Sequence, residues 1–301
     1  MKGEGRKAKW LEKLRRWAAN PRAALLASQP RIGLALGGGF ARGLAHVGVL
    51  RVFQEHHIPI YCVGGVSAGA IVAGAFASGT SWADIARVGS KMRFTDVARW
   101  SLSRMGFAAS TPMDSFLNRL LKCYRFEDMP IPLTVIATDL STGEPVQFRG
   151  HGDVKLPIRA SCSYPGLFQP IRCDGRLLVD GAMSVDLPVQ QVRRMGANRV
   201  IAVHLPMQSE QLAPTNMFQV VNRSIQIMQM RMEPEWRRHA DLVIEPDVRG
   251  MEWDSFRSAQ KLIEAGEKAA LAVLPKIRAW LGNRPADAGF APASTPDSVP
   301  A

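Results

Sequence analysis

Short apolar runs alternate with amphipathic stretches along most of the chain. The runs stand at residues 31–36, 60–63, 133–138, 177–179, 200–204 and 242–244. Runs of this length between turn residues are typical of strands that are buried on both faces. Helical patterns follow or separate them at residues 44–57, 214–232 and 255–281. Strands that alternate with helices favour an α/β fold with a mostly parallel central sheet.

One stretch, residues 60–77, has the pattern of a strand that turns sharply into a helix. Its apolar start meets Gly65-Val-Ser67-Ala-Gly69, and small residues follow. In a G-x-S-x-G elbow the glycines allow crowded backbone, and the strained serine is exposed for attack on a substrate. The same five-residue pattern also arises by chance, so it makes Ser67 a candidate nucleophile that needs support from elsewhere in the chain.

A glycine-rich loop, residues 37–43, directly follows the first predicted strand. A dinucleotide-binding motif requires glycine where Arg42 stands, and a phosphate-binding P-loop requires Lys-Ser/Thr where Leu44-Ala45 stands. We therefore expect no nucleotide cofactor, and we interpret the loop as a cradle of backbone N–H groups for an anion or oxyanion. Because strands joined by one helix are usually neighbours in a parallel sheet, this cradle and Ser67 should lie at the same edge.

Two aspartates follow predicted strands. Asp180 enters a Gly181-Ala182 turn, which suits a catalytic carboxylate, although a turn-forming aspartate explains the same pattern. Asp139 precedes Ser-Thr-Gly and is interpreted as a turn former in a hairpin between residues 133–138 and 144–149. Residues 80–128 are expected to be helical and to form a cap over or beside the site.

Positive charge is concentrated near the start of the chain. The net charge is +12, and residues 1–31 hold nine Lys/Arg against two Glu, which is +7 of that total. The rest is nearly balanced, which argues against a nucleic-acid scaffold. Residues 1–30 form a basic amphipathic segment. Its apolar face includes two tryptophans, Trp10 and Trp17. Its other face carries four cations, which are Lys9, Lys13, Arg15 and Arg16.

Two interpretations of this segment stay open. Tryptophans opposite a basic face fit a helix that lies on an anionic membrane surface, and a solvated, domain-packed or disordered segment fits equally. Residues 283–301 lack a hydrophobic period and are expected to be disordered. The four cysteines form no C-x-x-C pair and no secretory signal precedes them, so we expect reduced thiols in a cytoplasmic protein, with peripheral contact to the inner face of the membrane under the first interpretation.

Four motifs in order resemble the patatin-like phospholipases, in particular bacterial members similar to the patatin domain of neuropathy target esterase. They are the glycine loop at 37–43, the elbow at 65–69, a Ser-Cys-Ser-Tyr-Pro-Gly-Leu-Phe segment at 161–168 and Asp180-Gly-Ala182. The resemblance covers a domain at residues 31–282, with the catalytic motifs within 34–193. It implies a three-layer α/β/α fold and a lipid acyl hydrolase that acts on a phospholipid or another acyl ester.

The resemblance also implies roles for single residues. Ser67 matches the nucleophile and Asp180 its partner in a Ser–Asp dyad. The oxyanion element matches Gly38, Gly39, Arg42 and Gly43, and the family chemistry requires no metal or cofactor. Phe40 and Ala182 depart from the small residue and the glycine that are frequent at those places, and Phe40 bears on the choice of acyl chain.

Two alternatives remain. A Ser-His-Asp esterase of the α/β-hydrolase type needs a histidine after Asp180, and His204 or His239 satisfies that order. A non-catalytic, membrane-associated regulatory protein would keep the fold without turnover. A free aspartate has a pKa near ~3.9 and is a poor base for an alcohol, so the dyad mechanism is expected to rely heavily on the oxyanion donors.

Overall fold

The structure is a computed structural model, and it describes residues 30–206, 213–251 and 258–282. The strands are β1 (Ile32–Leu36), β2 (Cys62–Gly65), β3 (Arg99–Ser103), β4 (Gly106–Ala109), β5 (Leu133–Asp139), β6 (Pro145–Arg149), β7 (Ile171–Cys173), β8 (Arg176–Asp180), β9 (Arg199–Val203) and β10 (Leu242–Ile244). The α-helices are α3 (Leu44–Glu55), α4 (Ala68–Ala77), α5 (Trp82–Gly89), α6 (Phe94–Val97), α7 (Pro112–Leu120), α8 (Lys155–Ser161), α9 (Val189–Arg194), α10 (Met217–Arg237) and α11 (Ala259–Leu281). Short 3₁₀ helices are η1 (Phe40–Gly43), η2 (Phe126–Asp128) and η3 (Gly181–Met183).

Eight of the described strands form one sheet in the order β10-β9-β1-β2-β5-β8-β7, and β6 pairs with β5. The strands from β10 to β5 along this order are parallel, whereas β6, β7 and β8 join by antiparallel pairing. The prediction of a mixed α/β fold with a mostly parallel central sheet is therefore confirmed.

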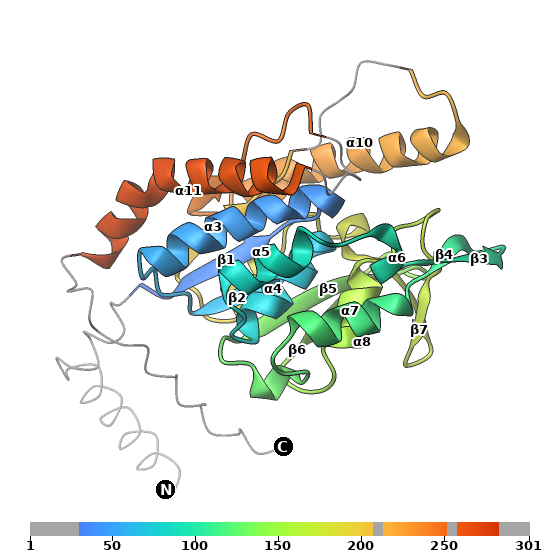
Figure 1. The fold of residues 1–301 in the computed structure, drawn as a ribbon, viewed down its shortest axis with the longest axis horizontal. Helices are drawn as coiled ribbons and strands as arrows, with labels where there is room; N and C mark the ends of the chain where they lie inside the picture. The colour runs from blue at the N-terminus through green and yellow to red at the C-terminus, as the bar shows by residue number, and fades with distance from the viewer. Residues whose placement is uncertain (1–29, 207–212, 252–257, 283–301) are drawn as a thin grey trace, which may run out of the picture.

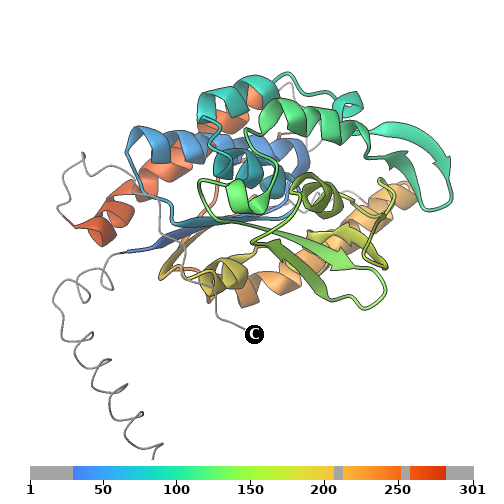
Figure 2. The same ribbon diagram turned by 90° about the horizontal axis from the view of Figure 1, so that it is seen from below.

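Helices cover both faces of the sheet, as Figures 1 and 2 show. Along β1 the buried side chains alternate, so that Leu34 and Leu36 enter one core while Ala35 enters the other. The larger core lies under α3, α4 and α11, and the smaller one lies under α9, where Val192 packs against the sheet. The alternation follows from strand geometry, since successive side chains point to opposite faces.

The expected hairpin between residues 133–138 and 144–149 is present as β5 and β6. The carboxylate of Asp139 accepts a hydrogen bond from the N–H of Ser141 at 2.9 Å, which is the turn-forming role that the sequence indicated.

The prediction that residues 80–128 are helical is wrong for one part of this range. An antiparallel hairpin of β3 and β4 interrupts the helices, apart from the main sheet. Backbone bonds hold it to the chain that follows α8: the N–H of Ala108 donates to Leu167 O, and Gln169 N–H donates to Ala108 O, both at 2.9 Å. A two-stranded hairpin is marginal alone, so this contact, which no local pattern reveals, decides its conformation.

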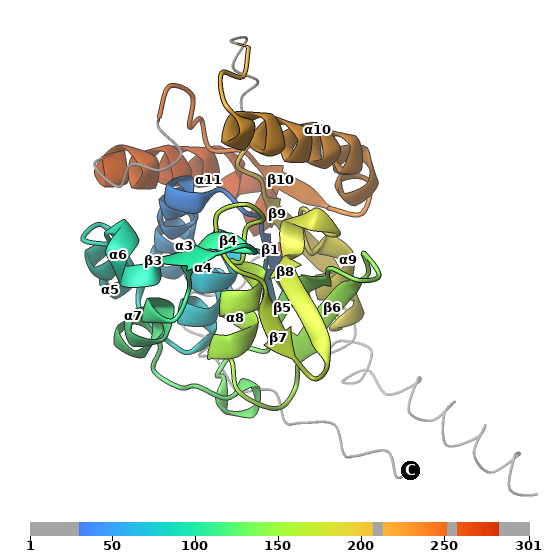
Figure 3. The ribbon, with the colours of Figure 1, turned by 90° about the vertical axis from the view of Figure 1, so that its right-hand side faces the viewer.

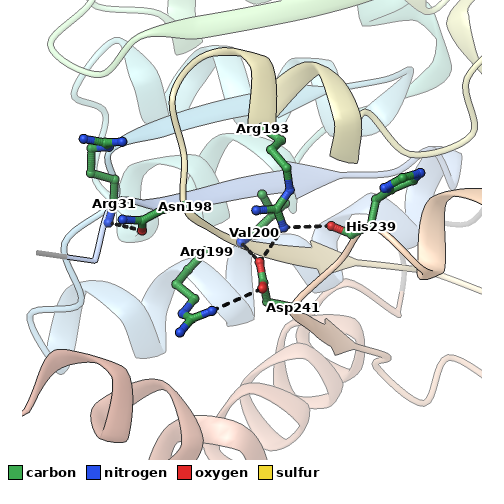
Figure 4. A network of polar contacts seen from close by, with 7 residues as sticks. All are labelled: Arg31, Arg193, Asn198, Arg199, Val200, His239 and Asp241. Atoms are coloured by element: carbon green, nitrogen blue, oxygen red, sulfur yellow. Dashed lines mark hydrogen bonds and ion pairs between the residues drawn. The ribbon is translucent and has the colours of Figure 1, made fainter. Parts of the chain in front are cut away.

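A polar network fastens the amino ends of the parallel strands (Figure 4). Asp241 accepts hydrogen bonds from the side chain of Arg193 at 2.6 Å and from the N–H of Val200 at 2.7 Å. The carbonyl of His239 also accepts a bond from Arg193, at 2.9 Å. His239 therefore lies at the end of the sheet opposite to the residues that follow the carboxyl ends of β1 and β2.

Some expectations fall outside the described residues. These are the basic segment with its tryptophans and the tail at 283–301. Within the described ranges, no helix combines the length and the apolar character that a membrane span needs.

Candidate active site

Ser67 stands at the sharp turn between β2 and α4, with φ of 53° and ψ of −127°. A residue with a side chain rarely adopts positive φ, and such strain is often found at functional sites. Two glycines make the turn possible. A Cβ on Gly65 would lie 2.4 Å from the carbonyl oxygen of Gly69, and one on Gly69 would lie 2.4 Å from that of Leu36. The predicted elbow is therefore present, with β2 at Cys62–Gly65, slightly later than expected.

Asp180 lies at the same edge of the sheet as Ser67 because β2 and β8 both pair with the same side of β5. The first residues of β5 pair with β2, as in Gly65 with Val135, and its last residues pair with β8, as in Ala137 with Asp180. On the other side, β6 pairs with β5 from Thr134 to Thr138. Strand β8 thus occupies the position that β2 leaves free after Gly65, which brings its last residue to the turn of Ser67.

The carboxylate of Asp180 is buried and only partly satisfied. Its Oδ1 accepts a hydrogen bond of 2.9 Å from the N–H of Ala182, while Oδ2 makes no hydrogen bond to any described residue. Burial raises the pKa of Asp180 to about 7, while the Ala182 N–H and the hydroxyl of Ser67 act in the opposite direction and the charge of Asp186 adds to the rise. The Ser67 hydroxyl therefore faces this carboxylate, although no hydrogen bond of regular geometry joins the two side chains.

Residues 161–168, which begin with the last residue of α8, contact both Ser67 and Asp180. The Oγ of Ser161 accepts a hydrogen bond of 2.9 Å from the N–H of Ser67, and the thiol of Cys162 lies 3.3 Å from the carbonyl of Ser67. One residue later, the carbonyl of Ser163 accepts a bond of 3.0 Å from the N–H of Asp180. The sequence singled out this segment only as part of the resemblance, and its contact with both residues depends on packing between distant elements.

The glycine loop lies against the serine. A Cβ on Gly38 would lie 3.4 Å from Ser67 Cβ and 3.9 Å from its Oγ. Within the described chain, the N–H groups of Gly38 and Gly39 have no hydrogen-bond partner. His46 supports the loop from α3, because its Nε2 lies 2.9 Å from the carbonyl of Gly37. Burial lowers the pKa of His46 to about 4, so the ring is neutral and donates this bond.

Arg42 and Gly43 have other contacts. The guanidinium of Arg42 donates to the carbonyl of Met251 at 2.9 Å, and its backbone N–H donates to Gly39 O at 3.1 Å. A Cβ on Gly43 would lie 2.8 Å from the Cβ of Ala68, so this glycine allows η1 to approach α4. Arg42 and Gly43 thus shape the loop, whereas Gly38 contacts the serine.

Neither candidate histidine lies between Ser67 and Asp180. The Nδ1 of His204 is 3.1 Å from Glu245, and its ring packs edge-on against Trp236. His239 belongs to the opposite end of the sheet, as described above.

One group among the described residues has the spacing of metal ligands, namely His204, Glu233 and Glu245, whose ligand atoms lie within 4.8 Å of one another. Arg237 already bonds both glutamates in this group. Its guanidinium supplies the positive charge that two adjacent carboxylates need, so the group is explained without an ion.

An apolar pocket of about 50 Å³ opens beside the elbow. It extends between α3, α4, α5 and α7, and its lining includes Phe40 and Ala68, the residue that follows the serine. Its other lining residues are Gly43, Leu44, Val47, Ile71, Val72, Ile85, Gly89, Met92, Phe116 and Leu120. A more polar cavity of about 140 Å³ lies along Gly37–Gly39 and is lined by Asp186, His204 and Glu233 among others.

Comparison with known proteins places this geometry in a family. The model of the patatin-like phospholipases matches residues 34–193. An uncharacterized NTE family protein of Mycobacterium bovis is 36% identical over 183 residues, which are 59% of this chain and 50% of that protein. A lysophospholipase NTE1 of Lodderomyces elongisporus is 34% identical over 191 residues, covering 60% of this chain and 13% of that protein. The chain thus spans half or less of the length of these relatives.

The solved structure of VipD from Legionella pneumophila shares the fold, with a TM-score of 0.54 at 12% identity over 82% of this chain and 67% of that one. The family model covers more than half of the chain and includes the glycine loop, the elbow and Asp180. The chain therefore belongs to the patatin-like phospholipase family.

Proposed function

We propose that this protein hydrolyses acyl esters of lipids, as a phospholipase A, lysophospholipase or esterase, through a dyad of Ser67 and Asp180. The observation that carries the proposal is the buried Oδ2 of Asp180, which has no other partner in the described chain and faces the hydroxyl of a strained serine. The family supports a lipid substrate, and one relative carries the name lysophospholipase.

In the first step the Oγ of Ser67 attacks the ester carbonyl and Asp180 accepts the hydroxyl proton. A general base works best when its pKa is near the operating pH, and a value of about 7 meets this condition where a solvated aspartate would not. The tetrahedral intermediate then expels the alcohol, which takes the proton from Asp180. Water attacks the acyl-enzyme, with Asp180 again taking the proton and Ser67 regaining it.

The N–H groups of Gly38 and Gly39 are the proposed donors to the oxyanion. The contact of Gly38 with Ser67 and the lack of a hydrogen-bond partner for either N–H group within the described chain support this role, and the helix start at Ala68 adds partial positive charge at the same place. The neutral ring of His46 keeps the loop in this conformation through Gly37.

The apolar pocket is the proposed seat of the acyl chain. It begins at Ala68, the residue after the nucleophile, and continues away from the oxyanion donors between helices. Phe40 lies at its edge with φ of 51°, so the side chain that departs from the family pattern contacts the pocket, as the sequence suggested for acyl-chain choice.

The contacts favour a dyad over the triad. His204 pairs with Glu245 and His239 lies at the other end of the strands, so neither orients toward Asp180. Instead the hydroxyl of Ser67 acts directly on the pKa of Asp180.

Hydrolysis of lysophosphatidylcholine and of phosphatidylcholine, followed as fatty-acid release, tests the proposal. We expect turnover by the wild type and a loss of about 10⁴-fold or more in Ser67→Ala, because the covalent step is removed. Equal fatty-acid release by both proteins would overturn the proposal. A wild type that is inert on lipids and on short p-nitrophenyl esters would favour the non-catalytic alternative.

A further inference from the structure

The β3–β4 hairpin exposes large apolar side chains to solvent. Trp100 is 67% exposed, Phe107 54% and Met105 50%. Met105 lies in the two-residue turn at the tip, and Trp100 also packs on Phe94, with ring centroids 5.2 Å apart. The hairpin extends beyond the rest of the described chain in Figure 1.

A second apolar group lies on the first turns of α10. Met217 is 75% exposed and Val220 51%, and Val221 is also exposed. Most soluble proteins expose large apolar residues singly, and a concentration of them on two neighbouring elements marks an interaction surface. We call the six residues Trp100, Met105, Phe107, Met217, Val220 and Val221 the apolar rim.

Both parts of the rim contact residues 161–168, the segment that bonds the backbone of Ser67. On one side, Ala108 of the hairpin forms a bridge with Phe168. On the other, Tyr164 donates a hydrogen bond of 2.8 Å to Asn222 of α10. The same segment begins at Ser161, which bonds the N–H of Ser67. Figure 3 looks onto this end of the molecule, with β3, β4 and α10 in view. The two parts of the rim therefore flank the segment that contacts Ser67.

The charge of the hairpin is positive. Arg99 and Arg104 are exposed, and neither forms an ion pair with a described residue, whereas arginines such as Arg119 and Arg159 pair with aspartates. The hairpin carries no acidic residue. Unpaired arginines beside tryptophan and other apolar side chains match the boundary between anionic headgroups and acyl chains.

We propose that the apolar rim, together with Arg99 and Arg104, docks this protein on an anionic phospholipid bilayer with the active-site opening toward the lipid. The rim inserts apolar side chains between headgroups, and the arginines bind lipid phosphates. Docking goes beyond the proposed hydrolysis and is separable from it, because it requires no reaction at Ser67. It is also distinct from the basic segment at residues 1–30.

Vesicle co-sedimentation of the full chain tests docking directly. All proteins carry Ser67→Ala, so that the lipid stays intact and a failure of the proposed hydrolysis does not affect the result. The vesicles are phosphatidylcholine, with and without phosphatidylserine. We expect Trp100→Ser/Met105→Ser/Phe107→Ser to reduce binding at least about tenfold on the mixed vesicles. Arg99→Gln/Arg104→Gln should reduce it by roughly 25-fold, since each cation near such a surface contributes about fivefold.

Leu271→Ser is the matched control, because this leucine is exposed on α11, away from the rim, and its loss should leave binding unchanged. In the catalytically intact chain, the triple variant should hydrolyse a short soluble ester at the wild-type rate. Unchanged vesicle binding by the triple variant, or an equal loss in Leu271→Ser, would overturn the proposal. A triple variant that changes from dimer to monomer in solution while binding vesicles as before would assign the rim to a second copy of this chain instead.

Discussion

The Oγ of Ser161 accepts a hydrogen bond of 2.9 Å from the backbone N–H of Ser67. This bond joins the end of α8 to the one residue of the elbow that has a positive φ and a side chain. Both partners belong to motifs that are far apart in the sequence, and Ser161 is fully buried. The contact therefore holds the strained conformation of the serine from outside its own turn.

Loss of this bond should affect stability and catalysis together. In Ser161→Ala the N–H of Ser67 has no acceptor, so we expect the free energy of unfolding to fall by about 1–3 kcal/mol. We expect kcat to fall roughly 10- to 100-fold because the nucleophile shifts. Ser163→Ala is the control, since among the described residues its hydroxyl bonds only the carbonyl of Arg159, one turn away. Similar kcat values for the two variants would contradict the positioning role of Ser161.

A methyl group at Gly38 should abolish most activity without unfolding the protein. The space at Gly38 is open except for contact with Ser67 at 3.4 Å, and its φ is not in the left-handed region. The methyl group would occupy the place of the oxyanion, so we expect Gly38→Ala to lose about 100-fold in kcat/KM with an unchanged Tm. A variant with near wild-type kcat/KM would exclude Gly38 from the oxyanion hole.

The pH dependence of kcat/KM should report Asp180. Because the base must be ionised and its pKa is about 7, kcat/KM should rise about tenfold per pH unit below that value and level off above it. The charge of Asp186 raises the pKa of Asp180, so Asp186→Asn should move the midpoint toward lower pH. A profile that is flat from about pH 5 to about pH 8 would mean that Asp180 is not the base.

Two opposite substitutions at Ile71 test the acyl pocket. Ile71 lines the pocket one turn after the nucleophile. Ile71→Phe should fill it and reduce kcat/KM for p-nitrophenyl octanoate relative to the acetate, and Ile71→Ala should shift the ratio the other way. Each methylene in such a pocket is worth about 10-fold or more in discrimination. Equal ratios in both variants would place the acyl chain elsewhere.

The elbow and the glycine loop could be predicted from the sequence because their constraints are local. Crowded backbone at Gly65 and Gly69 leaves a recognisable pattern, and apolar runs mark the buried strands on either side. The environment of Asp180 could not be predicted in this way. Its raised pKa arises because β8 takes the side of β5 that β2 leaves free, and that arrangement depends on pairing between distant strands.

The same distinction explains why the sequence did not predict the β3–β4 hairpin and why it indicated that Asp180 would be a poor base. The β3–β4 hairpin depends on the bridge between Ala108 and Phe168, and the hydrophobic pattern of the sequence does not predict that contact. A solvated aspartate would be a poor base, and only burial against the elbow makes Asp180 suitable.

The comparison that tests the dyad most directly is kcat/KM of Asp180→Asn and of His204→Ala on one soluble ester, in EDTA, with Ser67→Ala as the reference for lost catalysis. The dyad predicts that Asp180→Asn falls nearly as far as Ser67→Ala, because Asn cannot accept the proton. It predicts that His204→Ala stays within about tenfold of the wild type, since His204 pairs with Glu245. A collapse in His204→Ala comparable to that in Ser67→Ala would contradict the account and favour a triad.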